Sequence, residues 1–234
     1  MDGESMGRKY KYELHSHTSE VSGCAEVSAA GSYRLHEAAG YDGIVVTDHF
    51  YTDALNDRYS HVWSERSYGF MTGYRNMKSV AREGFDVLFG LEFRFHDSPN
   101  DYLVFGITPE LFSATPDIDL YDHAQLREFA DNNGLIIAQA HPFRGTCTPD
   151  APEFLDGMEV YNGHPWHAEH NDRALAYAEK YGLIKTSGSD FHHPGMLARG
   201  GIVTDSPIRN ERDLVDVLRS GNYELIRTLT SYAE

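Results

Sequence analysis

Residues 13–20 read ELHSHTSE, and this stretch places two histidines, His15 and His17, two positions apart. It closes a segment, residues 9–15, in which bulky residues alternate with polar ones as they do in a strand. Side chains two residues apart leave a strand on the same face, so both imidazoles are expected to point to one place. Two converging neutral imidazoles suit a divalent transition metal. One such pair arises by chance in many chains, so its meaning depends on the rest of the sequence.

Four later segments place metal-binding side chains near or just after the end of an apolar run. They are Asp48-His49 after residues 43–47, Glu92 within 85–95, His141 after 135–140, and Asp190-Phe191-His192 after 183–186. In α/β barrels the carboxyl ends of the strands form the catalytic rim. The sequence therefore predicts that these segments meet around bound metal ions, which the high count of 13 histidines also favours.

Apolar runs of strand length alternate with helical patterns along the chain. We expect strands near residues 9–15, 43–47, 85–95, 102–107, 135–140, 158–161, 183–186 and 202–204, and helices near 28–39, 64–82, 121–133, 169–181 and 211–218. This alternation predicts βαβ units and a mostly parallel sheet in an α/β protein. Because no linker-like gap separates the units, we expect residues 1–234 to form a single domain with a closed barrel.

Composition narrows the classes of ligand and location. A hydrophobic share of 41% is ample for a core, and a net charge of −16 argues against a surface that follows a polymeric nucleic acid. A small phosphorylated substrate stays compatible, since bound divalent ions would reverse the local field. Two cysteines are too few for a disulfide framework, and no apolar run is long enough to span a membrane, so we expect a cytoplasmic protein.

The ordered segments resemble the metal motifs of the PHP (polymerase and histidinol phosphatase) superfamily over about residues 10–205. These motifs are His15-x-His17, Asp48-His49, Glu92, His141-Pro142 and Asp190-x-His192. The resemblance implies a distorted, TIM-like (β/α)7 barrel with two or three divalent metal ions, namely Zn, Fe or Mn. It also implies phosphoester hydrolysis, which family members carry out on histidinol phosphate, nucleotides or nucleic-acid ends.

The resemblance also implies a ligand set. His15, His17, Glu92 and Asp190 would hold the first metal, and Glu92 would bridge to a second metal held with His141. A third metal would be held by His49, His192 and a residue of the loop after the first motif, for which we expect Glu20. A further histidine that the family carries after the glutamate is absent, and we expect Asp101 in its place. A carboxylate there would make the site more tolerant of Mn²⁺ or Mg²⁺.

The expected chemistry assigns roles to a few more residues. Two metals about 3.5–4 Å apart can activate one water for attack on phosphorus, which makes Glu92 and Asp190 part of the catalytic centre. Arg144 stands where a guanidinium could bind a phosphate, and Asn162 at a strand end could line the substrate pocket. Asp48 has the opposite parity to His49, so we expect it to support the site and not to bind metal.

We therefore expect a metal-dependent phosphoesterase acting on a small phosphomonoester, such as histidinol phosphate or a nucleotide. An amidohydrolase-type C–N bond hydrolase is an open alternative, because it also uses His-x-His on its first strand and an aspartate on its last. The Asp-x-His ending, Arg144 and the lack of a clear strand-borne lysine count against it. A metal-binding module without turnover is the other alternative, which the complete motif set disfavours. The sequence leaves the oligomeric state open.

Overall fold

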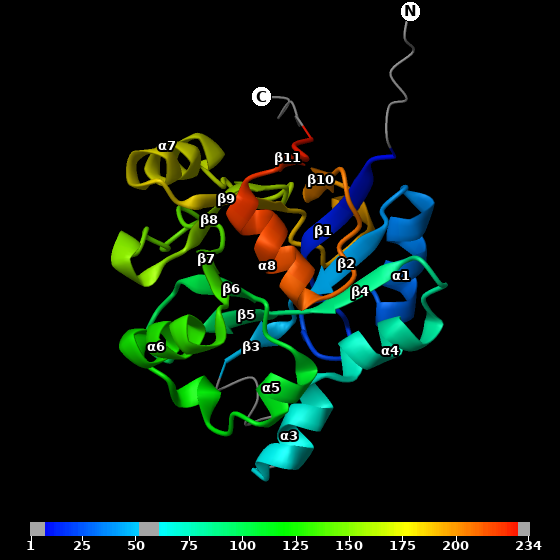
Figure 1. Ribbon diagram of the computed structural model, residues 1–234, viewed down its shortest axis with the longest axis horizontal. Coiled ribbons are helices and arrows are strands. Elements are labelled where there is room, and N and C mark those ends of the chain that lie inside the picture. Colours follow the sequence, from blue (N-terminus) through cyan, green and yellow to red (C-terminus); the bar gives the residue numbers. More distant parts are fainter. Residues whose placement is uncertain (1–7, 52–60, 229–234) are drawn as a thin grey trace, which may run out of the picture.

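Two hydrogen-bonded sheets form the centre of the protein, as seen in a computed structural model that describes residues 8–51 and 61–228 (Figure 1). The first sheet has the order β11 (Tyr223–Leu225), β10 (Ile202–Thr204), β1 (Tyr10–Ser16), β2 (Gly43–Val46) and β4 (Asp86–Phe89). The second has the order β3 (His49–Phe50), β5 (Leu91–Arg94), β6 (Asp101–Phe105), β7 (Ile136–Gln139), β8 (Gly157–Asn162) and β9 (Ile184–Gly188).

The strands run in mixed directions. β1, β2 and β4 are parallel to one another, and so are β7, β8 and β9. β6 is antiparallel to both of its neighbours, and β10 is antiparallel to β1. The α/β class is therefore as expected, whereas in the described part of the chain the ladders form two sheets and not one closed barrel.

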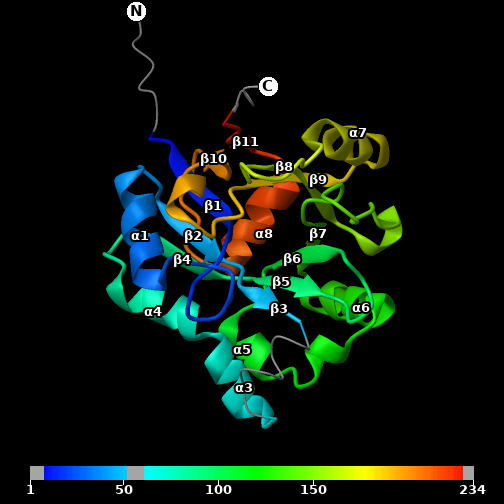
Figure 2. The same cartoon turned by 180° about the vertical axis from the view of Figure 1, so that it is seen from behind.

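Helices lie around the outside of the strands (Figure 2). They are α1 (Ala29–Ala38), α3 (Trp63–Phe70), α4 (Thr72–Val80), α5 (Pro109–Ser113), α6 (His123–Asn133), α7 (Asn171–Tyr181) and α8 (Glu211–Ser220). Local signals set several of their ends: Ser28 caps α1 by accepting from the Gly31 amide, and α6 begins with a capping box and ends at Gly134, whose φ is 66°. No helix among the described residues is long and apolar enough to cross a membrane.

Two expected elements are each divided in two. The predicted helix 64–82 breaks at Met71, and the predicted strand 85–95 breaks at Gly90, between β4 in one sheet and β5 in the other. Close packing requires glycine next to the helix break, because a Cβ on Gly73 would lie 2.1 Å from Thr18 Oγ1. The segment 109–116, which reads as a loop, contains the short helix α5, capped by Thr108.

The apolar core has two main parts. One packs the rings of Phe50, Phe70, Phe89 and Phe112 against each other, between the strands and helices α3 to α5. The other joins buried side chains of β1, β2, β6, β7 and β10 to the apolar face of α8. The strands are thereby held rigidly from both sides, so the side chains at their ends are fixed relative to one another.

Candidate metal centre

Seven of the predicted ligands come together, five of them at or just after the carboxyl end of a strand and two, His49 and Glu92, near the start of β3 and β5. His15 and His17 leave the end of β1 with ring centroids 5.1 Å apart, as the two-residue spacing predicts. The others are His49 on β3, Glu92 on β5, His141 after β7, and Asp190 and His192 after β9. His141 and Asp190 have positive φ values of 27° and 52°, so the backbone turns sharply where each side chain enters the site.

Glu92 lies at the centre of the cluster. Its Oε1 is 3.2 Å from His15 Nε2 and 3.0 Å from His141 Nε2. Its Oε2 is 3.4 Å from His17 Nε2 and 2.6 Å from His49 Nδ1. His49 and Glu92 are paired neighbours on the parallel strands β3 and β5, which explains their contact. One carboxylate thus reaches four imidazoles, the geometry that a bridging ligand requires.

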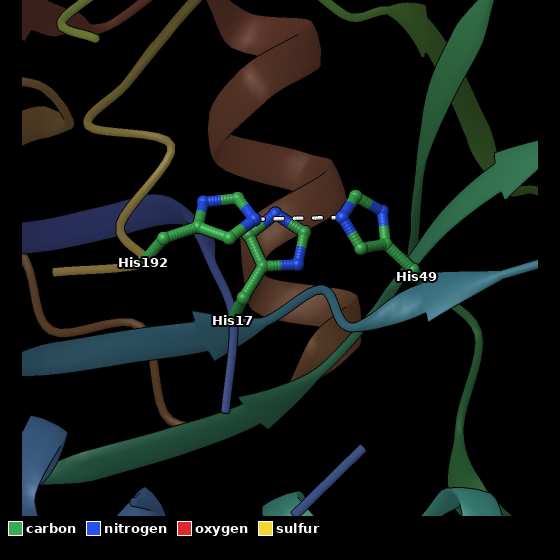
Figure 3. Close-up of side chains that lie close together, drawn as sticks. All are labelled: His17, His49 and His192. Carbon is green, nitrogen blue, oxygen red and sulfur yellow. Dashed lines mark hydrogen bonds between the residues drawn. The ribbon is translucent and has the colours of Figure 1, made fainter. Parts of the chain in front are cut away.

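Three overlapping groups have ligand atoms close enough to hold metal ions. They are His15, His17 and Asp190; His15, Glu92 and His141; and His17, His49 and His192, with all ligand atoms of a group within 4.8 Å of one another. Figure 3 shows the third group, in which His49 Nε2 and His192 Nε2 are 3.4 Å apart and the His17 ring packs against both of the other rings. The described residues therefore offer up to three sites that share ligands.

Buried polar atoms test whether metal ions fit these groups. Among the described residues, His15 Nε2, His17 Nε2, His49 Nδ1, His141 Nδ1 and Glu92 Oε2 are buried and form no well-aligned hydrogen bond, although carboxylate oxygens lie 2.6–3.4 Å from the first three. A buried polar atom without a hydrogen bond costs roughly 1–3 kcal/mol. Divalent cations would satisfy the atoms that face the cluster, so the donor set fits bound metal.

Hydrogen bonds from outside the cluster decide which nitrogen of each ring faces it. His15 Nδ1 lies 3.0 Å from Glu159 Oε1, and His17 Nδ1 lies 3.2 Å from Ser22 Oγ. His192 Nδ1 lies 2.9 Å from the backbone oxygen of Asp190. If each Nδ1 carries the proton and donates it in these bonds, each Nε2 keeps a lone pair for a metal ion.

Asp48 holds the loop after β1 in place and does not point its side chain into the cluster, as expected from its position next to His49 in the sequence. Its Oδ1 accepts from the Thr18 amide and from Ser22 Oγ, each at 2.7 Å, and its Oδ2 accepts from Thr18 Oγ1 at 2.7 Å. Ser22, so held, is the residue that orients His17. Asp48 therefore acts on the cluster through the loop after β1.

Two buried carboxylates at the site escaped the sequence analysis, Glu159 and Glu13. Glu159 on β8 accepts from His15 Nδ1, from the His141 amide at 3.0 Å and from Asn162 Nδ2 at 2.8 Å. Glu13 Oε1 accepts from the amides of Leu14, His15 and Ser189. The available signal was a charged residue inside an otherwise buried strand, which is costly without partners.

The charges at the site stabilise one another. Burial alone would lower the pKa of His15, but the carboxylates of Asp190, Glu159 and Glu92 raise it well above its usual value. Burial would raise the pKa of Glu92, but His49 and His15 lower it well below its usual value. Burial and the neighbouring His192 and His49 lower the pKa of His17 well below 6.5, which favours the neutral ring, the form of an imidazole that can bind a metal ion.

Four other predicted residues have different surroundings from those expected. Glu20 does not join the three groups: its oxygens accept from the Ala29 amide and from Asn76 Nδ2. Asp101 borders the cluster, 3.7 Å from His141 Nε2, but both of its oxygens are held by Arg94 at 2.6 and 2.7 Å.

Arg144 and Asn162 lie beside the cluster and contact its carboxylates. Arg144 Nη2 donates to Asp190 Oδ2 at 2.6 Å, and Arg144 Nε donates to Glu169. Asn162 is buried, and its side-chain amide donates to Glu159 and lies 3.4 Å from Asp190 Oδ2. The structure thus places Asn162 behind the ligands, where it orients Glu159.

A small cavity of about 250 Å³ opens over the cluster, lined among others by His49, Glu92, His141, Asp190 and His192. A groove of about 550 Å³ shares Arg94, Asp101, His141, Arg144 and His167 with it and continues toward Trp166. A molecule of metabolite size could therefore reach the cluster through this groove.

Comparison with known families identifies one match. A family model described as PHP-associated matches residues 168–223, a region that contains Asp190 and His192. None of the curated proteins matches the sequence.

Several solved structures share the fold at low sequence identity. A two-domain protein from Bacteroides vulgatus containing a predicted PHP-like metal-dependent phosphoesterase is similar over 94% of this chain, with a TM-score of 0.67 and 19% identity. This chain spans 65% of that protein's length. PsfC from Pseudomonas syringae is similar over 94% of this chain and 92% of its own, with a TM-score of 0.66 and 15% identity. An amidohydrolase from Chromobacterium violaceum, with bound sulfate and no metal, has a TM-score of 0.50 and 15% identity over 92% and 97% of the two chains.

Proposed function

We propose that this chain is a member of the PHP superfamily and a metal-dependent hydrolase of small phosphoesters. The observation that carries the proposal is the convergence of four imidazoles on the two oxygens of Glu92, with several of their buried nitrogens lacking a well-aligned hydrogen bond. We propose two or three divalent ions, Zn, Fe or Mn, as cofactors. Substrates of the right size are phosphomonoesters such as histidinol phosphate or a nucleotide.

The three groups of ligands suggest how the ions are shared. His15, His17 and Asp190 would hold one ion, and Glu92 would bridge it to a second ion at His141. The one free nitrogen of His17 would serve the first ion, so His49 and His192 would hold a third ion together with a ligand from the loop after β1. When bound, such ions supply an activated water and the positive charge that stabilises a phosphoryl transition state.

Arg144 is the proposed phosphate contact from the protein. It borders both the small cavity and the groove, so its guanidinium lies where a phosphate entering from the groove would meet the ligands. Its bond to Asp190 keeps that carboxylate oriented and, with His15, lowers the pKa of Asp190 well below its usual value despite burial. We propose that Arg144 orients Asp190 and draws the phosphate toward the metal centre.

We also propose that the two sheets are parts of one distorted, single-domain (β/α)7 barrel. The short segments 47–48 and 90 connect β2 to β3 and β4 to β5, so each pair continues one strand from the first sheet into the second. At the other side, His17 N donates to the Phe191 oxygen and Phe191 N donates to the His15 oxygen, which joins the end of β1 to the segment after β9. These contacts support a closed ring of seven strand units.

The test combines metal analysis with phosphate release. Purified protein should contain two to three equivalents of Zn, Fe or Mn and should release phosphate from a panel of small phosphoesters in a chelator-sensitive way. Glu92→Ala should abolish release and lower the metal content, whereas Glu83→Ala, which removes an exposed carboxylate, should behave like the wild type. Full activity in Glu92→Ala would contradict the assignment.

The amidohydrolase alternative receives less support from the site. None of the residues that line the small cavity is a lysine, the side chain that could be carboxylated between two metals in such enzymes. Turnover of dihydroorotate-like or lactam substrates, with no release from phosphoesters, would reverse this preference.

A further inference from the structure

A third ion would have only two histidine ligands, His49 and His192, because the free nitrogen of His17 serves the first ion. Two imidazoles are too few to hold a divalent ion and give it no negative charge. Glu20, the ligand expected from the sequence, is hydrogen-bonded to the Ala29 amide and Asn76. The missing ligand should come from the same loop as Glu20, because that loop faces both histidines. Cys24 is the remaining side chain of residues 20–24 with metal-binding chemistry.

The loop holds Cys24 beside both histidines. The Cys24 thiol interacts with the side chains of both His49 and His192, and all three residues line the small cavity. Bonds on either side fix the loop: the Ala25 amide donates to the Ser22 oxygen, and the Glu26 amide donates to the His192 oxygen at 2.9 Å. The segment that carries Cys24 is therefore attached directly to the segment that carries His192.

A second observation points to a ligand at this place. His49 Nε2 and His192 Nε2 face each other 3.4 Å apart, as Figure 3 shows. The other nitrogen of each ring is engaged elsewhere: His192 Nδ1 lies 2.9 Å from the Asp190 backbone oxygen and His49 Nδ1 lies 2.6 Å from Glu92 Oε2. The two Nε2 atoms are therefore spaced like two ligands of one ion, and Cys24 lines the same cavity.

We propose that Cys24 is a thiolate ligand of a divalent metal ion held by His49 and His192. This inference rests on the proposed metal centre but not on the reaction it catalyses. On binding, the thiol proton passes to solvent and a sulfur–metal bond forms, so the site gains one negative charge. A sulfur ligand favours Zn²⁺, Fe²⁺ or Co²⁺ over Mg²⁺ or Mn²⁺, so this site should select its ion differently from the two carboxylate-rich sites.

Cobalt loading tests the ligand directly, because a thiolate bound to Co²⁺ gives an intense sulfur-to-metal charge-transfer band in the near ultraviolet. The competing thiol is Cys147, which interacts with His141 and donates to the Pro99 oxygen. Full-length wild type and Cys147→Ser, loaded with Co²⁺ to saturation, should both show the band, and Cys24→Ser should lack it. A band that persists in Cys24→Ser, or is missing from the wild type, would overturn the proposal.

Alkylation of the wild type avoids any dependence on how the variant folds. Cys24 is exposed and should react with iodoacetamide in chelator-treated protein, but zinc-loaded protein should protect it, as peptide mass spectrometry would show. Equal labelling of Cys24 with and without zinc would count against ligation. A cobalt band without phosphate release would refute the proposed function but support Cys24 as a ligand. Phosphate release without the band would support the proposed function but refute Cys24 as a ligand.

Discussion

Replacing Glu159 with glutamine should weaken metal binding without disturbing the fold. The Glu159 carboxylate is fully buried and accepts three hydrogen bonds, one on Oε1 from His15 Nδ1 and two on Oε2 from the His141 amide and Asn162 Nδ2. Glutamine has nearly the same shape but one oxygen in place of two. Whichever way its amide is turned, at least one of the three donors faces an NH₂ group.

The loss should fall on the metal ligands in either orientation. If the glutamine oxygen takes the Oε2 position, the NH₂ group faces His15 Nδ1, and His15 must move its proton to Nε2, the nitrogen that faces Glu92 and would bind the proposed ion. If the amide is reversed, the His141 amide and Asn162 lose their acceptor. Removing a residue that hydrogen-bonds to a metal ligand typically lowers the affinity for the metal ion about 10–100-fold, or about 1.4–2.7 kcal/mol.

Competition with a chromogenic zinc chelator measures this affinity. Glu159→Gln should bind its tightest zinc ion about 10–100-fold more weakly than the wild type. The matched control is Glu153→Gln, the same substitution at an exposed carboxylate in the short helix Pro152–Phe154, which should bind zinc like the wild type. Circular dichroism of the metal-free proteins should show the same secondary structure for all three. Unchanged zinc affinity in a folded Glu159→Gln protein would refute the role assigned to this carboxylate.

Three further results follow from the contacts described above. Glu20→Gln should leave the metal content unchanged, because Glu20 lies outside the ligand groups; loss of one equivalent would restore it as a ligand. Arg144→Ala should raise KM for phosphate release about 10–100-fold, since a charge-assisted hydrogen bond is worth about 1.5–3 kcal/mol, and an unchanged KM would exclude it as a phosphate contact. Burial lowers the pKa of His36 to about 4, although a hydrogen bond to Ser32 opposes this shift. The unfolded chain protonates His36 near pH 6.5, so up to about 3 kcal/mol of folding free energy should be lost as the pH falls from 6.5 to 4. Denaturant titrations should show a smaller loss in His36→Gln, and equal losses would contradict the assigned pKa.

Local patterns in the sequence predicted most of the elements and most of the residues that gather at the candidate site. Alternation placed β1 and its two histidines, and apolar runs placed the strands that deliver Glu92, His141 and Asp190. Cap residues predicted helix ends such as Ser28 and Gly134. These features can be predicted because backbone geometry alone sets how often a side chain returns to the same face of a helix or strand, whichever part of the protein that face contacts.

Contacts between segments far apart in the sequence could not be predicted from local patterns. The pattern of residues 85–95 suggested one strand, but packing against Val45 and Thr47 at Gly90 divides it between two sheets. Whether the strands form one ring depends on pairings such as Ser16 with Phe191, which no local period specifies. His36, which reads as an ordinary helix residue, proves fully buried because α1 packs it against Tyr41 and Phe191.

The sequence alone determined which chemical groups stand at the ends of the strands, because side-chain alternation and strand length are local properties. Only the tertiary structure decided which of them meet. It joined His15 to Glu159 across 144 positions, brought Cys24 to His49 and His192, and kept Glu20 at the start of α1. Loop conformations and long-range pairing depend on the packing of the whole chain, and for that reason local patterns could not predict which side chains of the loop after β1 lie beside the histidines.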